Sequence, residues 1–88
     1  MIGLDRKFAQ IDALKKLGFT IKQAWILQHC LDYEFLYVED IHNKYLSVHA
    51  VRLLVKQGHL DRHAPNRYDE LHYDISDRTM KMIKGVLP

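Results

Sequence analysis

Basic and histidine side chains gather in one stretch of this 88-residue chain, residues 42–67. The stretch holds five lysines and arginines against one acidic residue, a formal charge of +4. The remainder holds eight basic and ten acidic residues, a formal charge of −2. The basic residues of the stretch are Lys44, Arg52, Lys56, Arg62 and Arg67, and four of the six histidines lie among them. A positive patch on a nearly neutral protein favours a polyanion such as nucleic acid.

Residues 47–57 have the pattern of a short amphipathic helix that begins at a capping serine and ends before a glycine. His49, Arg52 and Lys56 are spaced i, i+3 and i+7 and share one face. The apolar residues share another face: Val48, Val51, Leu54 and Val55. A helix with a polar face over a buried one suits the major groove. We expect Arg52 to read a guanine edge, His49 to contact a base or phosphate, and Lys56 to contact a phosphate.

A β-hairpin is predicted directly after this helix. Its strands are expected at residues 59–63 and 68–75, around a Pro-Asn turn at residues 64–67. Basic residues on or beside such a hairpin reach a minor groove or the flanking phosphates. The remaining candidate DNA contacts are therefore Lys44 from the preceding helix and, from the hairpin, Arg62, His63, Asn66 and Arg67.

The other elements that position these residues are mostly helical. Apolar spacing predicts helices over residues 4–17, 20–33 and 38–46, and a last helix that begins at Ser76. Residues 33–37 form an aromatic connection, and residues 35–38 are a candidate third strand beside the hairpin. The expected fold is a single domain, residues 1–88, that is mainly α with a small β-hairpin wing, an α+β winged helix-turn-helix.

Three segments resemble the winged helix-turn-helix domains of bacterial regulators, most closely the MarR-like type. Residues 19–27 are similar to that family's second helix, residues 53–63 to the end of its recognition helix and the start of its wing, and residues 73–83 to the passage from the wing into the last helix. The resemblance implies a transcription regulator that binds double-stranded DNA without a cofactor. The recognition helix is shorter than in that family and the long C-terminal dimer helices are absent. We therefore expect any homodimer to form through residues 4–17.

A second interpretation is a winged helix that binds protein, such as a phage- or plasmid-type modulator or inhibitor of a host or transcription protein. Its candidate contacts are Tyr33, Phe35 and Tyr37, which lie among acidic residues between positions 32 and 40. Exposed aromatic side chains are common in protein interfaces. DNA binding that weakens with salt distinguishes the two interpretations, because the electrostatic contribution is obligatory only for DNA.

Other function classes lack support in the sequence. His59 and His63 lie in a predicted strand, where residues four apart are separated by about 13 Å and do not chelate one metal ion. With the lone Cys30 expected as a small buried hydrophobe, we predict no metal site and no disulfide. There is no glycine-rich phosphate loop or nucleophile elbow, so no enzyme is predicted. The sequence lacks the apolar runs of a membrane span and of a signal peptide, which favours the cytoplasm.

Overall fold

The computed structural model describes the backbone of residues 2–87 and the side chains of residues 5–87. This part of the chain forms five helices and one three-stranded antiparallel sheet, a small α+β protein. The elements in chain order are α1 (Ile2–Lys16), α2 (Ile21–Tyr33), β1 (Leu36–Tyr37), α3 (Val38–Asn43), α4 (Val48–Lys56), β2 (Leu60–His63), β3 (His72–Ile75) and α5 (Asp77–Lys84). No helix in the described part is long and apolar enough to cross a membrane.

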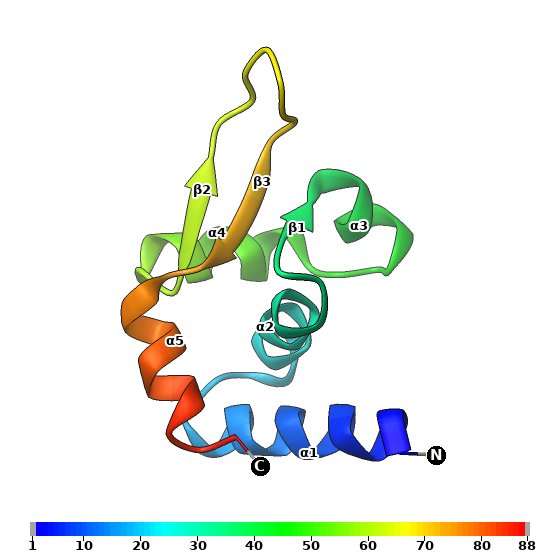
Figure 1. Cartoon of the computed structure of the whole chain (residues 1–88), viewed down its shortest axis with the longest axis vertical. Coiled ribbons are helices and arrows are strands. Elements are labelled where there is room, and N and C mark those ends of the chain that lie inside the picture. Colours follow the sequence, from blue (N-terminus) through cyan, green and yellow to red (C-terminus); the bar gives the residue numbers. More distant parts are fainter. Residues whose placement is uncertain (1, 88) are drawn as a thin grey trace.

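The sheet places the hairpin at one end of the molecule, with α1 at the opposite end (Figure 1). Its strand order is β1-β3-β2, so the second hairpin strand lies in the middle. Leu36 and Arg62 both pair with Tyr73, and Tyr37 and His63 both pair with His72, one on either side of β3. Side chains at directly opposed positions lie on the same face of a sheet. Each set of three residues therefore forms a row across the sheet.

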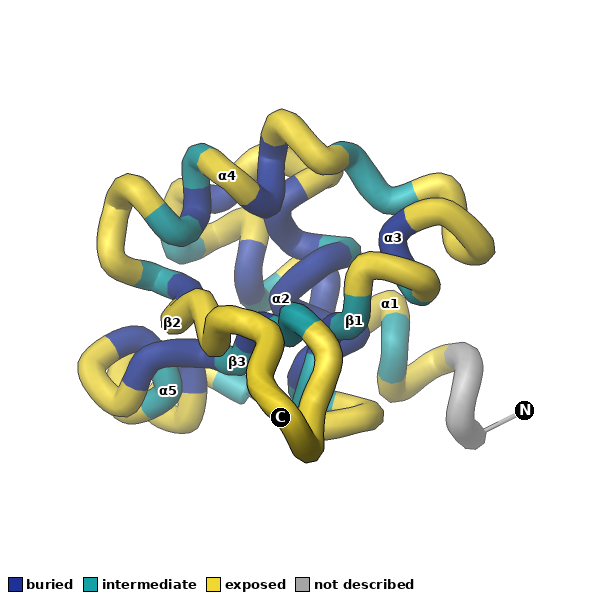
Figure 2. The backbone as a smooth tube through the Cα atoms, turned by 90° about the horizontal axis from the view of Figure 1, so that it is seen from above, coloured by how far each residue is buried: buried dark blue, intermediate teal, exposed yellow. Residues whose placement is uncertain are grey.

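The core lies between α2, α4 and one face of the sheet. Buried residues occupy the middle of the molecule and exposed residues its rim and the hairpin tip (Figure 2). Seven of the thirteen residues of α2 are buried, so this helix is central and well covered. Cys30 is 2% exposed, and burial raises the pKa of its thiol to about 12. The side chain is therefore a neutral core residue, as predicted.

Side chains at the predicted starts of the helices cap them. Thr20 accepts a hydrogen bond from the backbone N–H of Gln23, whose side chain accepts one from the backbone N–H of Thr20. Ser47 caps α4 by accepting from the backbone N–H of Ala50. Gly18, which follows the predicted helix of residues 4–17, has a φ of +105°, a backbone conformation that favours glycine. The side chain of Leu4, the first residue of the predicted helix over residues 4–17, lies outside the described side chains.

Ser76 joins three elements. Its Oγ accepts from the backbone N–H of Thr79 at 3.4 Å, which caps α5 as predicted, and donates to the carbonyl of Gly58 at 2.8 Å. Its backbone N–H donates to the carbonyl of His59, and the N–H of His59 donates back to Leu54 in α4. The end of α4, the start of β2 and the start of α5 are thereby held together.

Four details of the sequence interpretation are wrong or incomplete. The second hairpin strand, predicted at residues 68–75, begins only at His72, and residues 64–71 form a loop. The helix predicted at residues 38–46 ends at Asn43, because Tyr45 adopts a φ of +54° that a helix cannot contain. Val48 is 41% exposed, while the smaller Ala50 takes the buried position. The candidate third strand is present but contains only two residues.

We predict that Ser76→Ala lowers the free energy of unfolding by about 2 kcal/mol, because it removes both the α5 cap and the bond to Gly58. The matched control is Ser47→Ala, which removes a cap alone and is expected to cost about 1 kcal/mol. Urea denaturation of both variants measures the difference. Equal losses in the two variants would show that the bond from Ser76 to Gly58 contributes no stability.

Candidate nucleic-acid interface

Helix α4 is oriented by its apolar side, which contains the buried residues Ala50, Val51 and Leu54 and packs against α2 and β2. The opposite side carries the exposed side chains His49, Arg52 and Lys56. The helix contains no acidic residue. The predicted polar face is thus present as an exposed basic surface, held in place by the packing of the other side.

Arg52 of α4 and Arg62 of β2 meet across a shallow depression between the helix and the hairpin. Val55, Leu71 and Tyr73 complete its lining, and its volume is about 370 Å³. Both arginines are exposed at the residue level. Two guanidinium-bearing side chains around one depression raise the local positive potential and attract an anion such as a phosphate.

The hairpin divides its predicted DNA contacts between two faces. Arg62 shares the α4 face of β2 with the buried Leu60, because residues two apart in a strand point the same way. Asp61 and His63 point to the other face, which we call the outer face of the sheet. The single acidic residue of the basic stretch therefore lies away from α4. His63 also lies away from α4, with its Nε2 2.9 Å from Asp74 Oδ1.

Asn66 shapes the hairpin tip. Its Oδ1 accepts hydrogen bonds from the backbone N–H groups of Tyr68 and Asp69, and its own N–H donates to the carbonyl of Asp69. This Asx-type turn replaces strand pairing in the loop. The side-chain oxygen of Asn66 is therefore used within the turn, and Arg67 is presented as an exposed side chain at the tip.

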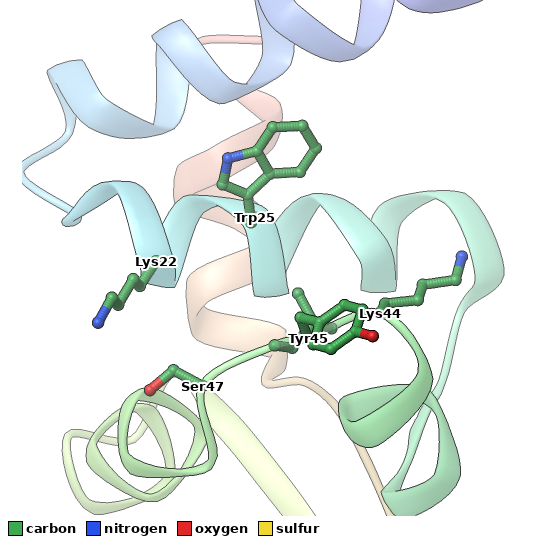
Figure 3. A pocket seen from close by; sticks show the side chains of 6 residues that line it. Lys22, Trp25, Lys44, Tyr45 and Ser47 are labelled. Carbon is green, nitrogen blue, oxygen red and sulfur yellow. The ribbon is translucent and has the colours of Figure 1, made fainter.

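Lys44 is separated from the basic residues of α4. Its Nζ lies 4.3 Å from the centre of the Tyr33 ring, a cation–π contact at the end of α2. Figure 3 shows its side chain extending away from Ser47, where α4 begins. Lys44, a predicted DNA contact, thus lies on a different part of the surface from Arg52 and Lys56.

Lys22 of α2 lies beside the start of α4. It lines a pocket of about 570 Å³ together with Trp25, Lys44, Tyr45, Leu46 and Ser47. Its side chain extends on the side of Ser47, whereas Trp25 points toward α1 (Figure 3). Tyr45 is 96% exposed in the turn between α3 and α4. Sequence reasoning missed Lys22 and Tyr45, since both lie outside the periodic pattern of the recognition-type helix.

A buried histidine lies behind Lys44. His29 is 5% exposed, and its Nε2 is 3.6 Å from Asp40 Oδ2, too long for a hydrogen bond. Its ring packs against Tyr33 with the ring centres 4.7 Å apart. Burial and the Lys44 ammonium lower the pKa of His29, although Asp40 opposes them. Burial and Arg78 likewise lower the pKa of His59, whose Nδ1 is 3.0 Å from Thr79 Oγ1.

The three aromatic residues of the protein-binding interpretation do not form one cluster. Tyr33 packs against His29 and Lys44. Phe35 and Tyr37 instead pack against each other and against His72 on the outer face of the sheet. Only the latter pair is thus part of a continuous aromatic surface within the described residues.

No group of three or more histidine, cysteine or acidic side chains in the described part is arranged to hold a metal ion. Comparisons of the chain with protein-family models, with curated proteins and with solved structures find no match. Function must therefore be inferred from the arrangement of side chains on α4, the hairpin and the outer face of the sheet.

We predict that stability falls as the pH is lowered from about 7.5 to 5.5, in part because of His29 and His59. Both histidines have a lowered pKa in the folded state, so the unfolded chain takes up these protons first as the pH falls below the ordinary value of 6.5. Below the folded-state pKa values of these two histidines, both the folded and the unfolded chain are protonated, and the histidines no longer make stability depend on pH. Denaturation at constant ionic strength across this range measures the slope. His29→Gln and His59→Asn should each reduce it, and an unchanged slope in both variants contradicts the assignment.

Proposed function

We propose that this chain is a winged helix-turn-helix protein that binds double-stranded DNA and regulates transcription. One observation carries the proposal: the exposed basic residues of α4 and Arg62 of β2 converge on one face, while Asp61 lies on the opposite face of the sheet. Such a face attracts the DNA backbone through charge and offers a helix to the major groove.

The order of the elements supports this assignment. Helices α3 and α4 are joined by residues 44–47, a connection of the length found in helix-turn-helix motifs, and α4 would be the recognition helix. The β2–β3 hairpin follows at once and would be the wing. MarR-like regulators, which the sequence resembles, are expected to have the same order of recognition helix and wing. That this chain is of the MarR-like type is part of the proposal.

The length of α4 limits how DNA can be read. Nine residues give a helix of roughly 14 Å, close to the 12 Å or so of the major-groove width. A helix this short offers few side chains to base edges, and we assign base contact to Arg52 and His49. Most of the affinity must then come from phosphates, contacted by Lys56 and Lys22 beside the groove and by Arg62 and Arg67 from the wing.

The proposed homodimer through residues 4–17 stays a prediction. Helix α1 exposes Phe8, which is 49% accessible and packs edge-on against Trp25. Exposed charged residues surround it on the same helix: Asp5, Arg6, Asp12, Lys15 and Lys16. An interface through this helix would therefore be largely polar.

We predict that Arg52→Ala and Arg62→Ala each weaken binding to a duplex of about 25 base pairs, by roughly 1–3 kcal/mol for Arg52 if it reads a base. Fluorescence anisotropy at low and moderate salt measures this. Arg6→Ala is the matched control, since this exposed arginine lies on α1 away from α4. The wild-type affinity should fall steeply with salt. Absence of binding at low salt, or equal affinity of all three variants, would remove the basis for the proposal.

A second prediction tests the position of Lys22. Lys22→Gln should weaken binding to all DNA sequences alike and reduce the slope of log affinity against log salt by about one, because it removes one phosphate contact. Lys16→Gln, an exposed lysine at the end of α1, serves as the control and should leave the slope unchanged. Equal slopes for the two variants would place the DNA away from the start of α2.

A further inference from the structure

The outer face of the sheet carries a row of rings that crosses all three strands. Tyr37, His72 and His63 occupy directly opposed positions on β1, β3 and β2. The His63 and His72 rings are stacked, 4.8 Å apart with an interplanar angle of 16°, and the His72 and Tyr37 ring centres are 5.4 Å apart. Phe35 meets His72 edge-on at 5.2 Å. The row is thus continuous from Phe35 to His63.

Two aspartates lie next to this row in a position that is unfavourable for the isolated protein. Asp61 and Asp74 are directly opposed on β2 and β3, and like charges at such positions repel. Asp74 is 2.9 Å from His63, but no ion pair of Asp61 is found among the described side chains. A cation bound between the two carboxylates would remove this repulsion.

More negative charge continues from Asp74 toward the end of α2. Asp74 also lines a pocket of about 600 Å³ with Asp32 and Glu34, and Lys84 is the one basic residue in its described lining. The pocket and the outer face meet at Asp74. Together they form a surface of rings and carboxylates, which we call the acidic aromatic face.

The acidic aromatic face is accessible to a large ligand. The side chain of His63 is 44% exposed and that of Asp74 is 32% exposed. Phe35, Tyr37 and His72 are partly exposed, whereas on the opposite side of the sheet the hydrophobic residues are buried against the core: Leu36, Leu60, Tyr73 and Ile75. Figure 1 shows the loop between β2 and β3 projecting beyond the helices. Rings that already pack on one another are held in place, so a partner can contact them at little cost in side-chain order.

We propose that the acidic aromatic face binds an arginine-rich segment of a partner protein. A guanidinium group stacks on aromatic rings and forms paired hydrogen bonds with a carboxylate, and this face offers rings and carboxylates side by side. Charge complementarity excludes nucleic acid here, because the carboxylates repel phosphates. The inference is independent of DNA binding by α4, whose basic surface lies on the other side of the sheet.

Arginine is favoured over lysine by the geometry. The planar guanidinium matches stacked rings and the two oxygens of a carboxylate, whereas an ammonium acts as a compact point charge. Successive arginines at alternate positions of an extended segment would face the sheet together, since side chains two apart point the same way. One arginine would lie between Asp61 and Asp74 and the next over Tyr37 and Phe35.

The test uses the full chain and a fluorescein-labelled twelve-residue peptide of alternating arginine and serine. Peptides with citrulline or lysine in place of arginine are the matched probes. Anisotropy gives the affinity, and amide NMR shifts give the location. We expect the arginine peptide to bind at least about fivefold more tightly than either analogue, since it alone combines charge with a planar fork. The shifted amides should lie in residues 35–37, 61–63 and 72–74. Equal affinity for the lysine or citrulline peptide, or shifts centred elsewhere, overturns the proposal.

Variants separate this face from general attraction between opposite charges. Asp61→Asn combined with Asp74→Asn should weaken the arginine peptide by about fivefold or more, and Tyr37→Leu should weaken it without a change in charge. Asp12→Asn on α1 and Arg52→Ala on α4 are the controls and should leave the peptide affinity unchanged. Equal loss in Asp12→Asn indicates unspecific attraction and overturns the proposal. If the double variant does not fold, the comparison of peptides on the wild-type chain decides the question alone.

Discussion

The connection between α4 and β2 is the constraint on which the proposed interface depends. Gly58 adopts a φ of +83°, and its carbonyl is held by Ser76 at the far end of the hairpin. His59 follows at once, with its ring against Phe19 and Thr79. These contacts fix the angle between helix and hairpin. Because Arg52 lies on the helix and Arg62 on the hairpin, the depression that both line depends on this angle.

The alternation of side chains along β2 separates the charges of the hairpin. Arg62 faces α4, whereas the residues on either side of it, Asp61 and His63, face outward. Although the net charge of the chain is small, the hairpin therefore has a basic side toward α4 and an acidic side on the outer face of the sheet. A shift of register by a single residue would exchange these positions and mix the charges. The pairing of buried Leu60 with buried Ile75 opposes such a shift, because it would expose both side chains.

Local signals in the sequence predicted the helices and caps well. Thr20, Ser47 and Ser76 cap helices at the predicted starts, because a cap depends on residues within one turn. The hairpin was harder to predict. Asn66 accepts hydrogen bonds from two backbone N–H groups and so forms a turn where the strand over residues 68–75 was predicted to begin. The site was predicted in part: α4 exposes its basic face, but the positions of Lys22, Lys44 and His63 depend on contacts between elements far apart in the chain.

The outer row of rings also explains why such a short strand as β1 persists. Two residues give little backbone pairing, and an isolated strand of that length is unstable. Leu36 is fully buried on the core side, while Tyr37 packs against His72 on the outer side. The strand is thus held by one side chain on each face more than by its hydrogen bonds. A ligand that covers the outer rings would strengthen the pairing of β1 with β3 and, through β3, the position of the hairpin.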